Sequence, residues 1–260
     1  MGGMDGTSTE LLRGRAGRVA GSLQLDEADN DHINLGMTSI LVPAGDFTVT
    51  AWIRFSDNGK DENERILDCS DGDAFGAMSN GFNFKTQNGT LRAFIGDGSN
   101  KAATPTSASV LGKERWYLVA LRYRASSNPG VATDGLVQVS AIASTNDALV
   151  ATDVATKTDR VSHKAGAIGS STELLAGTPS GTAKTAALSF DGRMDDIRVY
   201  DNVLTDAELA DIHNETLEVD ACLRWIFNVA DDREGWSAAG TTTDLVVDGD
   251  YVVVSAGNDP

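Results

Sequence analysis

Four aspartates lie within eleven positions of one segment, "FDGRMDDIRVYD": Asp191, Asp195, Asp196 and Asp201. Carboxylates this close together could form a catalytic set, a metal site or the solvated edge of a strand. The segment has the pattern of a strand, and strand alternation predicts that Asp195 and Asp196 point to opposite faces, so that only one of them serves a given site. We interpret Asp191 as a turn residue before Gly192 and Asp201 as the polar end of the strand.

The rest of the chain shows no recognisable catalytic motif. Glycosidases need two carboxylates at a fixed separation. The nearest pattern is Glu62 and Glu64 in "DENER", which we assign to a solvated turn between strands. Three histidines, His32, His163 and His213, are scattered, and no metalloprotease, nucleophile-elbow or phosphate-loop pattern occurs. We therefore expect a protein that binds its ligand without transforming it.

Other acidic turns offer the hard oxygen atoms that calcium prefers. Asp26, Asp29 and Asp31 follow the first expected strand, and "DCSDGDAFG" contributes Asp68, Asp71 and Asp73. None of these turns has the EF-hand pattern. Aspartate also stabilises turns without any metal, so turn chemistry remains an equally open interpretation of each.

Polar residues of one expected hairpin, "GFNFKTQNGTLRAFIGDG", are candidates for contact with a sugar. Sugars are recognised through hydrogen bonds and aromatic rings, and the aromatic content of 6% argues against a broad stacking platform. Trp52, Trp116 and Tyr123 lie in the middle of expected strands, which favours the core. The candidate ligand-binding residues are Asp71, Asp73, Asn83, Lys85, Arg92, Asp97 and Asn100.

The charge balance narrows the class of partner. The 260 residues include 21 Lys and Arg against 38 Asp and Glu, a formal net charge of −17. Such a field repels phosphate backbones and anionic membranes, so we expect no nucleic-acid partner. No apolar run is long enough to span a membrane. The first residues lack the features of a signal peptide, which leaves secretion open.

The elements that position these residues are mainly short strands. "DFTVTAWIRFSD" alternates apolar and polar residues, and "WYLVAL" is apolar on both faces. Asn88-Gly89 favours a tight hairpin turn. One helix is expected, because Thr205 and Glu208 form a capping box flanked by Leu204 and Leu209. The 41% of hydrophobic residues suffices for a substantial core. The many short strands predict an all-β fold, an antiparallel β-sandwich with one short helix.

Composition divides the chain into three parts. We expect a lead-in at 1–20, the sandwich at 21–220, and the start of a second module or terminal strands at 221–260. The two cysteines, Cys69 and Cys222, either form a long-range disulfide or are both buried thiols.

Several segments together resemble the laminin-G-like, concanavalin A-like lectin/glucanase superfamily over residues 21 to about 216. They are "SLQLDEADNDHINLG", "DFTVTAWIRF", "ERWYLVALRY" and, most specifically, "FDGRMDDIRVYDNVLTDAELADIHN". The stretch 125–187, where ligand-binding loops often lie, departs from the family pattern. The end of the chain, from "WIFNVADD" on, resembles the start of a jelly-roll module.

The resemblance implies a concanavalin A-like jelly roll and structural calcium. The position of Asp195 is commonly a calcium ligand in the superfamily, and Asp26, Asp29 and Asp31 are expected near it. The implied function is a non-catalytic, lectin-like carbohydrate-binding module in a larger secreted or cell-surface bacterial protein, beside neighbouring modules. The alternatives are a structural, adhesion or virion-surface module, and a glycan-cleaving hydrolase or lyase of the same fold.

Overall fold

The computed structural model of the chain describes residues 15–16, 18, 21–28, 31–37, 45–56, 63–72, 80–97, 101–103, 111–124, 135–144, 149–157, 173–180, 186–214, 223–225, 244–248 and 251–255.

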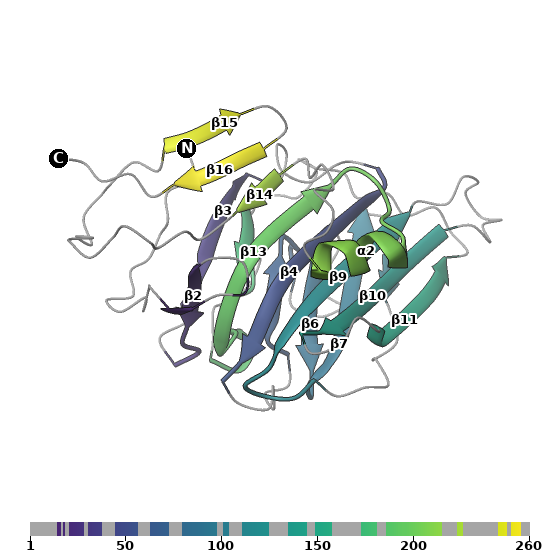
Figure 1. The fold of residues 1–260 in the computed structure, drawn as a ribbon. Helices are drawn as coiled ribbons and strands as arrows, with labels where there is room; N and C mark the ends of the chain where they lie inside the picture. Colours follow the sequence, from purple (N-terminus) through teal and green to yellow (C-terminus); the bar gives the residue numbers. More distant parts are fainter. Residues whose placement is uncertain are drawn as a thin grey trace.

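Two antiparallel sheets form a sandwich (Figure 1). The larger sheet has the order β1-β2-β13-β4-β9-β10-β11, with β14 also paired to β13, and the smaller has the order β3-β12-β5-β6-β7-β8. The strands of the larger sheet are β1 (Arg15–Ala16), β2 (Gly21–Leu25), β4 (Phe47–Phe55), β9 (Trp116–Arg124), β10 (Gly135–Ala143), β11 (Leu149–Lys157), β13 (Gly192–Tyr200) and β14 (Leu223–Trp225). Those of the smaller are β3 (Ile33–Met37), β5 (Arg65–Asp68), β6 (Asn80–Gln87), β7 (Thr90–Asp97), β8 (Lys101–Ala103) and β12 (Glu173–Ala176).

The remaining elements are few. A hairpin of β15 (Asp244–Asp248) and β16 (Tyr251–Ser255) forms a separate two-stranded sheet. In the described part of the chain, a 3₁₀ turn, η1, spans Ala186–Leu188, and one α-helix, α2, spans Asp206–Asn214. The predicted all-β antiparallel sandwich with one short helix is therefore confirmed.

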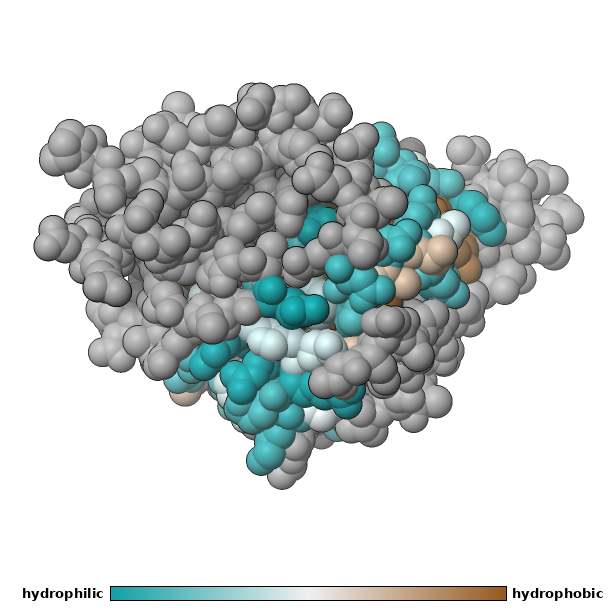
Figure 2. Space-filling model, viewed as in Figure 1, coloured by the Kyte–Doolittle hydropathy of each residue, from teal (hydrophilic) through white to brown (hydrophobic). Residues whose placement is uncertain are grey.

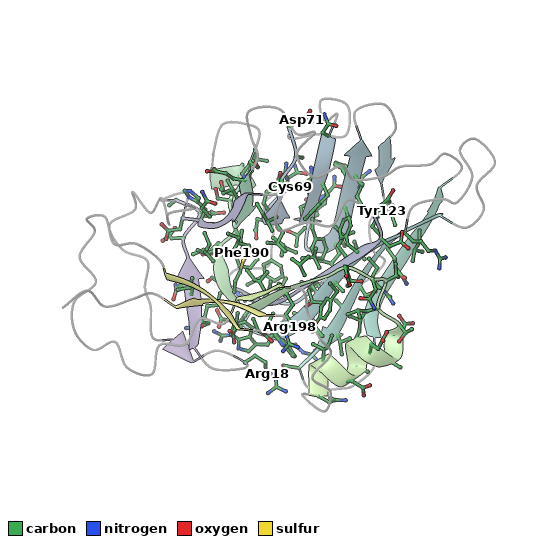
Figure 3. The ribbon with its side chains drawn as sticks, turned by 90° about the horizontal axis from the view of Figure 1, so that it is seen from above. Arg18, Cys69, Asp71, Tyr123, Phe190 and Arg198 are labelled. Atoms are coloured by element: carbon green, nitrogen blue, oxygen red, sulfur yellow. The ribbon has the colours of Figure 1, made fainter. Side chains whose placement is uncertain are left out.

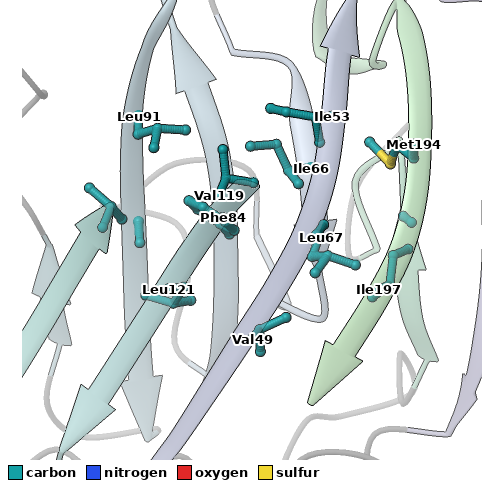
Figure 4. Close-up of a cluster of buried hydrophobic side chains, with 14 of the residues drawn as sticks. Val49, Ile53, Ile66, Leu67, Phe84, Leu91, Val119, Leu121, Met194 and Ile197 are labelled. Atoms are coloured by element: carbon teal, nitrogen blue, oxygen red, sulfur yellow. The ribbon is translucent and has the colours of Figure 1, made fainter. Parts of the chain in front are cut away.

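The core lies between the two sheets and follows from strand alternation. In β4, the five alternate residues that begin with Phe47 and end with Phe55 all lie in this core. They meet inward residues of β5, β6, β9 and β13, several of which are drawn in Figure 4. Each such apolar side chain contributes about 1.5–3 kcal/mol when fully buried. Tyr123 and Trp52 are buried as expected, Tyr123 between the sheets and Trp52 on the opposite face of the larger sheet.

Helix α2 covers that opposite face, so that the smaller sheet, the larger sheet and the helix form successive layers (Figure 3). Its capping box is present as predicted. The Thr205 amide donates to Glu208 Oε2 at 2.6 Å, and the Glu208 amide donates to Thr205 Oγ1 at 3.2 Å. Leu209 and Ile212 pack against Trp52. Around the helix, the visible described residues are mostly hydrophilic (Figure 2).

Strand β13 contains a bulge that simple alternation does not predict. Asp195 pairs with Trp52, but Arg198 pairs with Thr50, so β13 has one residue more than β4 in this interval. Asp196 takes up the extra residue with a φ of 44°. Its carboxylate contacts Arg198 Nε at 3.0 Å. Since Trp52 and Thr50 share one face of β4, Asp195 and Arg198 share that face too. The Asp196 carboxylate contacts Arg198 and so lies on the side of Asp195, which makes the prediction of opposite faces wrong.

The edge of β13 away from β4 is shared by two distant parts of the chain. Its residues 192–194 pair with β2, and its residues 197–199 pair with β14. Strand β14 lies beyond the domain boundary expected at residue 220, yet it belongs to the larger sheet. None of the described helices has the length and apolar character needed to cross a bilayer.

Candidate functional site

The β6–β7 hairpin and β5 place a set of mostly polar side chains on the side of the smaller sheet that points away from the core, where all of them except Arg92 are buried. Its Asn88-Gly89 turn has positive φ angles of 53° and 74°, as the sequence predicts. The register pairs Gln87 with Thr90, so alternate residues face the core or point outward. Phe82 and Phe84 face the core. The outward residues of the hairpin and of neighbouring β5 make up what we call the polar face: Arg65, Asp68, Asn83, Lys85, Arg92 and Phe94.

Three cations lie side by side across the polar face. Arg65 pairs with Lys85, and Lys85 pairs with Arg92 on the next strand. Lys85 Nζ lies 2.5 Å from Asn63 Oδ1 and 4.8 Å from the Phe94 ring centre. Arg92 lies on the same ring, with its guanidinium carbon 4.9 Å from the centre. The ring therefore supports both cations and is buried beneath them.

Arg65 is neutralised within the polar face. Its Nε donates to Asp68 Oδ2 at 2.7 Å, and both side chains are fully buried. Asp68 Oδ1 also accepts from the amide and the hydroxyl of Ser70, at 2.7 and 2.8 Å. Burial raises the pKa of the Asp68 carboxyl, although the charge of Arg65 and the hydrogen bonds of Ser70 act in the opposite direction.

Arg92 is placed differently. Its side chain is half-buried, and its Nη1 donates to Gln87 Oε1 at 2.6 Å. No carboxylate of the described residues pairs with it, and its buried Nε–H finds no acceptor among them. The positive charge of Arg92 therefore faces outward next to a neutral amide.

Asn83 lies between Asp68 and Phe94 in the register of the smaller sheet. Its side chain is fully buried, yet neither its amide nitrogen nor its amide oxygen has a hydrogen-bond partner in the described part of the chain. A buried polar group left unsatisfied costs about 1–3 kcal/mol. This cost marks the amide as a group that a ligand hydroxyl could satisfy.

The structure brings together three of the seven predicted ligand residues: Asn83, Lys85 and Arg92. Asp71 instead closes a turn at the far end of β6, where its Oδ1 accepts from the Asn80 amide at 3.0 Å (Figure 3). Asp97 ends β7, and the description there is limited to its backbone. Asp73 and Asn100 lie outside the described residues.

Sequence reasoning missed Arg65 and Phe94, and it weighed Asp68 only as part of an acidic turn. Phe94 could have been found, because it alternates with the core residues Ala93 and Ile95 of the same strand. Arg65 and its placement beside Asp68 could not be foreseen, because a register shift between Arg65 and Leu67 brings two residues three positions apart onto one face.

The predicted calcium ligands are not gathered around Asp195. Leu25, just before Asp26, pairs with Gly192, so Asp26 and Asp195 are separated by about 13 Å along the strands at roughly 3.3 Å per residue. No group of three or more His, Cys, Asp or Glu side chains suited to a metal occurs among the described residues. Asp29 lies outside them.

The aspartates themselves have structural contacts. Asp31 Oδ2 accepts from the Asp26 amide at 3.2 Å, and Asp26 Oδ1 accepts from the Ala28 amide at 2.9 Å, as in a self-stabilised turn. Asp195 Oδ2 accepts from the Arg18 amide at 2.7 Å and so ties the start of the described chain to β13. These contacts do not amount to a calcium site, and calcium binding stays a prediction.

Of the residues weighed for catalysis, the structure describes Glu64, His32 and His213. Glu64 is fully buried at the start of β5, where its carbonyl accepts from the Thr86 amide at 2.9 Å, so its assignment to a solvated turn is wrong. Glu62 and His163 lie outside the described residues. His213 Nε2 lies 2.9 Å from the Ala143 carbonyl oxygen and anchors the helix.

Cys69 is buried in the core of the sandwich and forms no disulfide with any described residue. Burial raises its pKa well above the ordinary value for a thiol. Cys222 lies outside the described residues, and the state of the pair stays a prediction.

A family model described as the concanavalin A-like lectin/glucanases superfamily matches residues 26–210. A search of the curated proteins finds no match. One solved structure of similar fold is the enzymatically active domain of tailspike protein 2 from bacteriophage CBA120, with a TM-score of 0.55, 12% identity and coverage of 79% of this chain and 29% of that chain.

Two toxin binding domains are also similar. The binding domain of botulinum neurotoxin serotype G has a TM-score of 0.54, 11% identity and coverage of 84% of this chain and 47% of that chain. The binding domain of Paraclostridial Mosquitocidal Protein 1 has a TM-score of 0.52, 11% identity and coverage of 84% and 48%. This chain thus spans less than half the length of each of these three solved chains, and the identities show likeness of fold alone.

Proposed function

Because this chain belongs to the concanavalin A-like lectin/glucanases superfamily, we propose that it is a non-catalytic glycan-binding module whose site is the polar face. The observation that carries the proposal is the buried amide of Asn83, which has no hydrogen-bond partner among the described residues. A sugar hydroxyl both donates and accepts hydrogen bonds, so it can satisfy an amide group that is costly to leave unpaired.

The chemistry of the polar face suits weak binding by hydrogen bonds. Phe94 lies beneath Lys85 and Arg92, so its ring positions the cations and is not available as a stacking platform. A hydrogen bond to a sugar replaces one to water and contributes about 0.5–1.5 kcal/mol. A few such bonds correspond to a Kd of roughly micromolar to millimolar strength. Gln87 and Arg92 are half-buried, and a ligand would meet this end of the hairpin first.

The same face gives little support to hydrolysis. A glycosidase needs two carboxylates across the scissile bond. Asp68 is the one carboxylate of the polar face, and it is engaged by Arg65 and Ser70. We therefore propose binding without chemistry, within a larger secreted protein in which neighbouring modules supply avidity.

Binding can be tested on a broad glycan array, with calcium and with chelator, followed by affinity electrophoresis on the polysaccharides that score. Asn83→Leu removes the amide but keeps a side chain of the same branched shape, and it should abolish binding while the protein stays folded. Asn202→Leu, an exposed asparagine after β13, is the matched control and should bind like the parent.

Three outcomes separate the alternatives. Binding that is lost only in Asn83→Leu supports the proposal. If nothing on the array binds, the structural or adhesion module takes its place. New reducing ends or unsaturated sugars released from the same panel would show an enzyme instead.

A further inference from the structure

We infer that the glycan bound by the polar face is acidic, with a carboxylate or sulfate group held at Lys85 and Arg92. This inference rests on the proposed function and specifies its ligand class. The reasoning starts from the placement of charge, which a site for neutral sugars does not require.

Like charges stand directly opposite one another in this part of the smaller sheet. The register pairs Arg65 with Lys85 and Lys85 with Arg92. Directly opposed like charges destabilise an antiparallel pair. Asp68 compensates Arg65 through a buried ion pair. The corresponding compensation for Arg92 is absent from the described residues, since its contacts are the Gln87 amide oxygen and the Phe94 ring. An anion placed beside Arg92 and Lys85 would supply it.

The three cations of the polar face, Arg65, Lys85 and Arg92, have the opposite sign to the net charge of the molecule. The chain has a formal net charge of −17, which repels anions at long range. At physiological salt this repulsion is screened beyond about 8 Å, so an anion that reaches the polar face responds mainly to the charges beside it. The described residues of the polar face include the cations Lys85, Arg92 and Arg65 and the carboxylate of Asp68, which pairs with Arg65.

The hydrogen-bond donors of Lys85 and Arg92 are held in place by contacts within the protein. Lys85 Nζ and the Arg92 guanidinium lie 4.8 and 4.9 Å from the same ring centre, so one buried side chain supports both cations. The Arg92 Nε–H has no acceptor among the described residues, and a guanidinium binds carboxylates through pairs of parallel hydrogen bonds. Asn83 is opposite Phe94 and can bind a hydroxyl of the same sugar. Acid group and hydroxyl would then be recognised by neighbouring residues.

The test uses the whole chain and a glycan array that contains neutral, uronic, sialylated and sulfated sugars. Calorimetry then compares matched pairs: tetragalacturonate with its methyl ester, and a κ-carrageenan tetrasaccharide with its desulfated form. The pairs distinguish carboxylate from sulfate as the source of charge. We expect acidic sugars to dominate the array and each bound acid to exceed its neutral counterpart by about ten- to hundredfold, as expected for hydrogen bonds to a charged group.

Two substitutions locate the site. Arg92→Gln keeps hydrogen-bonding capacity but removes the charge, and it should weaken binding of the acidic sugar about tenfold or more while leaving the neutral sugar unaffected. Arg54→Gln makes the same change of charge on the larger sheet, where Arg54 pairs with Glu114, and should leave binding unchanged.

The failures are distinguishable. Equal affinity for acidic and neutral partners overturns the acidic ligand and leaves the proposed function standing. No binding anywhere on the array overturns both. A preference for acidic sugars that survives Arg92→Gln overturns the placement of the acid group at this face.

Discussion

The side chain of Asn83 is subject to opposite demands from stability and from binding. In the absence of a ligand, its buried amide finds no partner among the described residues. Replacing such a group by an apolar side chain of similar size removes the cost of its desolvation. Residues that serve a ligand are often less than optimal for stability for this reason.

Asn83→Leu should therefore increase the free energy of unfolding by about 1–3 kcal/mol. Urea denaturation of the parent and the variant, without glycan, measures this difference. Asn202→Leu should stay within about 0.5 kcal/mol of the parent, as surface substitutions usually do. A clear loss of stability in Asn83→Leu would show that the amide supports the fold.

Cys69 should be unreactive in the folded protein. Its thiol is buried and its pKa is raised by desolvation, so the reactive thiolate is scarce and shielded. We expect no alkylation of Cys69 at pH 7 to 9 under native conditions and rapid alkylation in denaturant. Mass spectrometry of peptides measures the alkylation of Cys69 separately from that of Cys222.

The same measurement tests the disulfide. Under denaturing, non-reducing conditions, modification of both cysteines excludes the disulfide.

The raised pKa of Cys69 also has a consequence for stability. Below the ordinary thiol pKa both the folded and the unfolded chain keep this proton. As the pH rises above it, the unfolded chain loses a proton that the folded chain retains, so the stability contributed by Cys69 falls. Cys69→Ala should remove this part of the alkaline loss, and denaturation curves at pH 7 and pH 10 compare the two proteins.

At the scale of the element, the hairpin was predictable and strand β13 was not. Alternation around Asn88-Gly89 predicts that Asn83, Lys85 and Arg92 share the outward side, and the register confirms it. The extra residue at Asp196 breaks this rule in β13, because a bulge depends on the pairing with β4 and not on the sequence of β13 alone. The same limit hid the placement of Arg65 beside Asp68 behind the register shift in β5.

Helix α2 was also predictable, because its start depends on local hydrogen bonds. Thr205→Ala removes the hydroxyl that accepts from the Glu208 amide and should lower the free energy of unfolding by about 1 kcal/mol. Thermal melting should show a decrease of a few degrees. Asp201→Ala changes a nearby exposed residue outside the cap and should have little effect. Equal melting temperatures for Thr205→Ala and the parent would contradict the role of the cap.

At the scale of the whole molecule, the spacing of alternating segments sufficed for the sandwich, and the resemblance of four segments indicated the superfamily. The sequence left residues 221–260 open between a second module and terminal strands. Strand β14 has only three residues, and its pairing with β13 is long-range, so no local pattern predicts it. The calcium prediction belongs to this scale too, since the resemblance assigns the ion a role in tying the first and last strands together. The structure gives Asp195 a different contact, the Arg18 amide.

Calcium can be tested with Asp195→Asn, which keeps an oxygen acceptor for the Arg18 amide but loses the charge. A site that binds the folded state alone stabilises it by about 2.7 kcal/mol at a hundredfold excess over Kd. If Asp195 is a ligand, the parent should melt several degrees higher in calcium than in chelator, and the variant should melt alike in both. The calcium hypothesis ends if the parent shows no shift and elemental analysis finds no metal.

The division of the β13 edge between β2 and β14 bears on how the protein should be handled in solution. A fragment that stops at residue 220 would lack β14, and the backbone N–H and C=O groups of Ile197–Val199 would lose their ladder on that side. Such open edges recruit strands from other molecules. We expect that fragment to form aggregates, whereas one that continues through Trp225 should stay monodisperse. The smallest well-behaved unit would then be set by three residues of a distant strand.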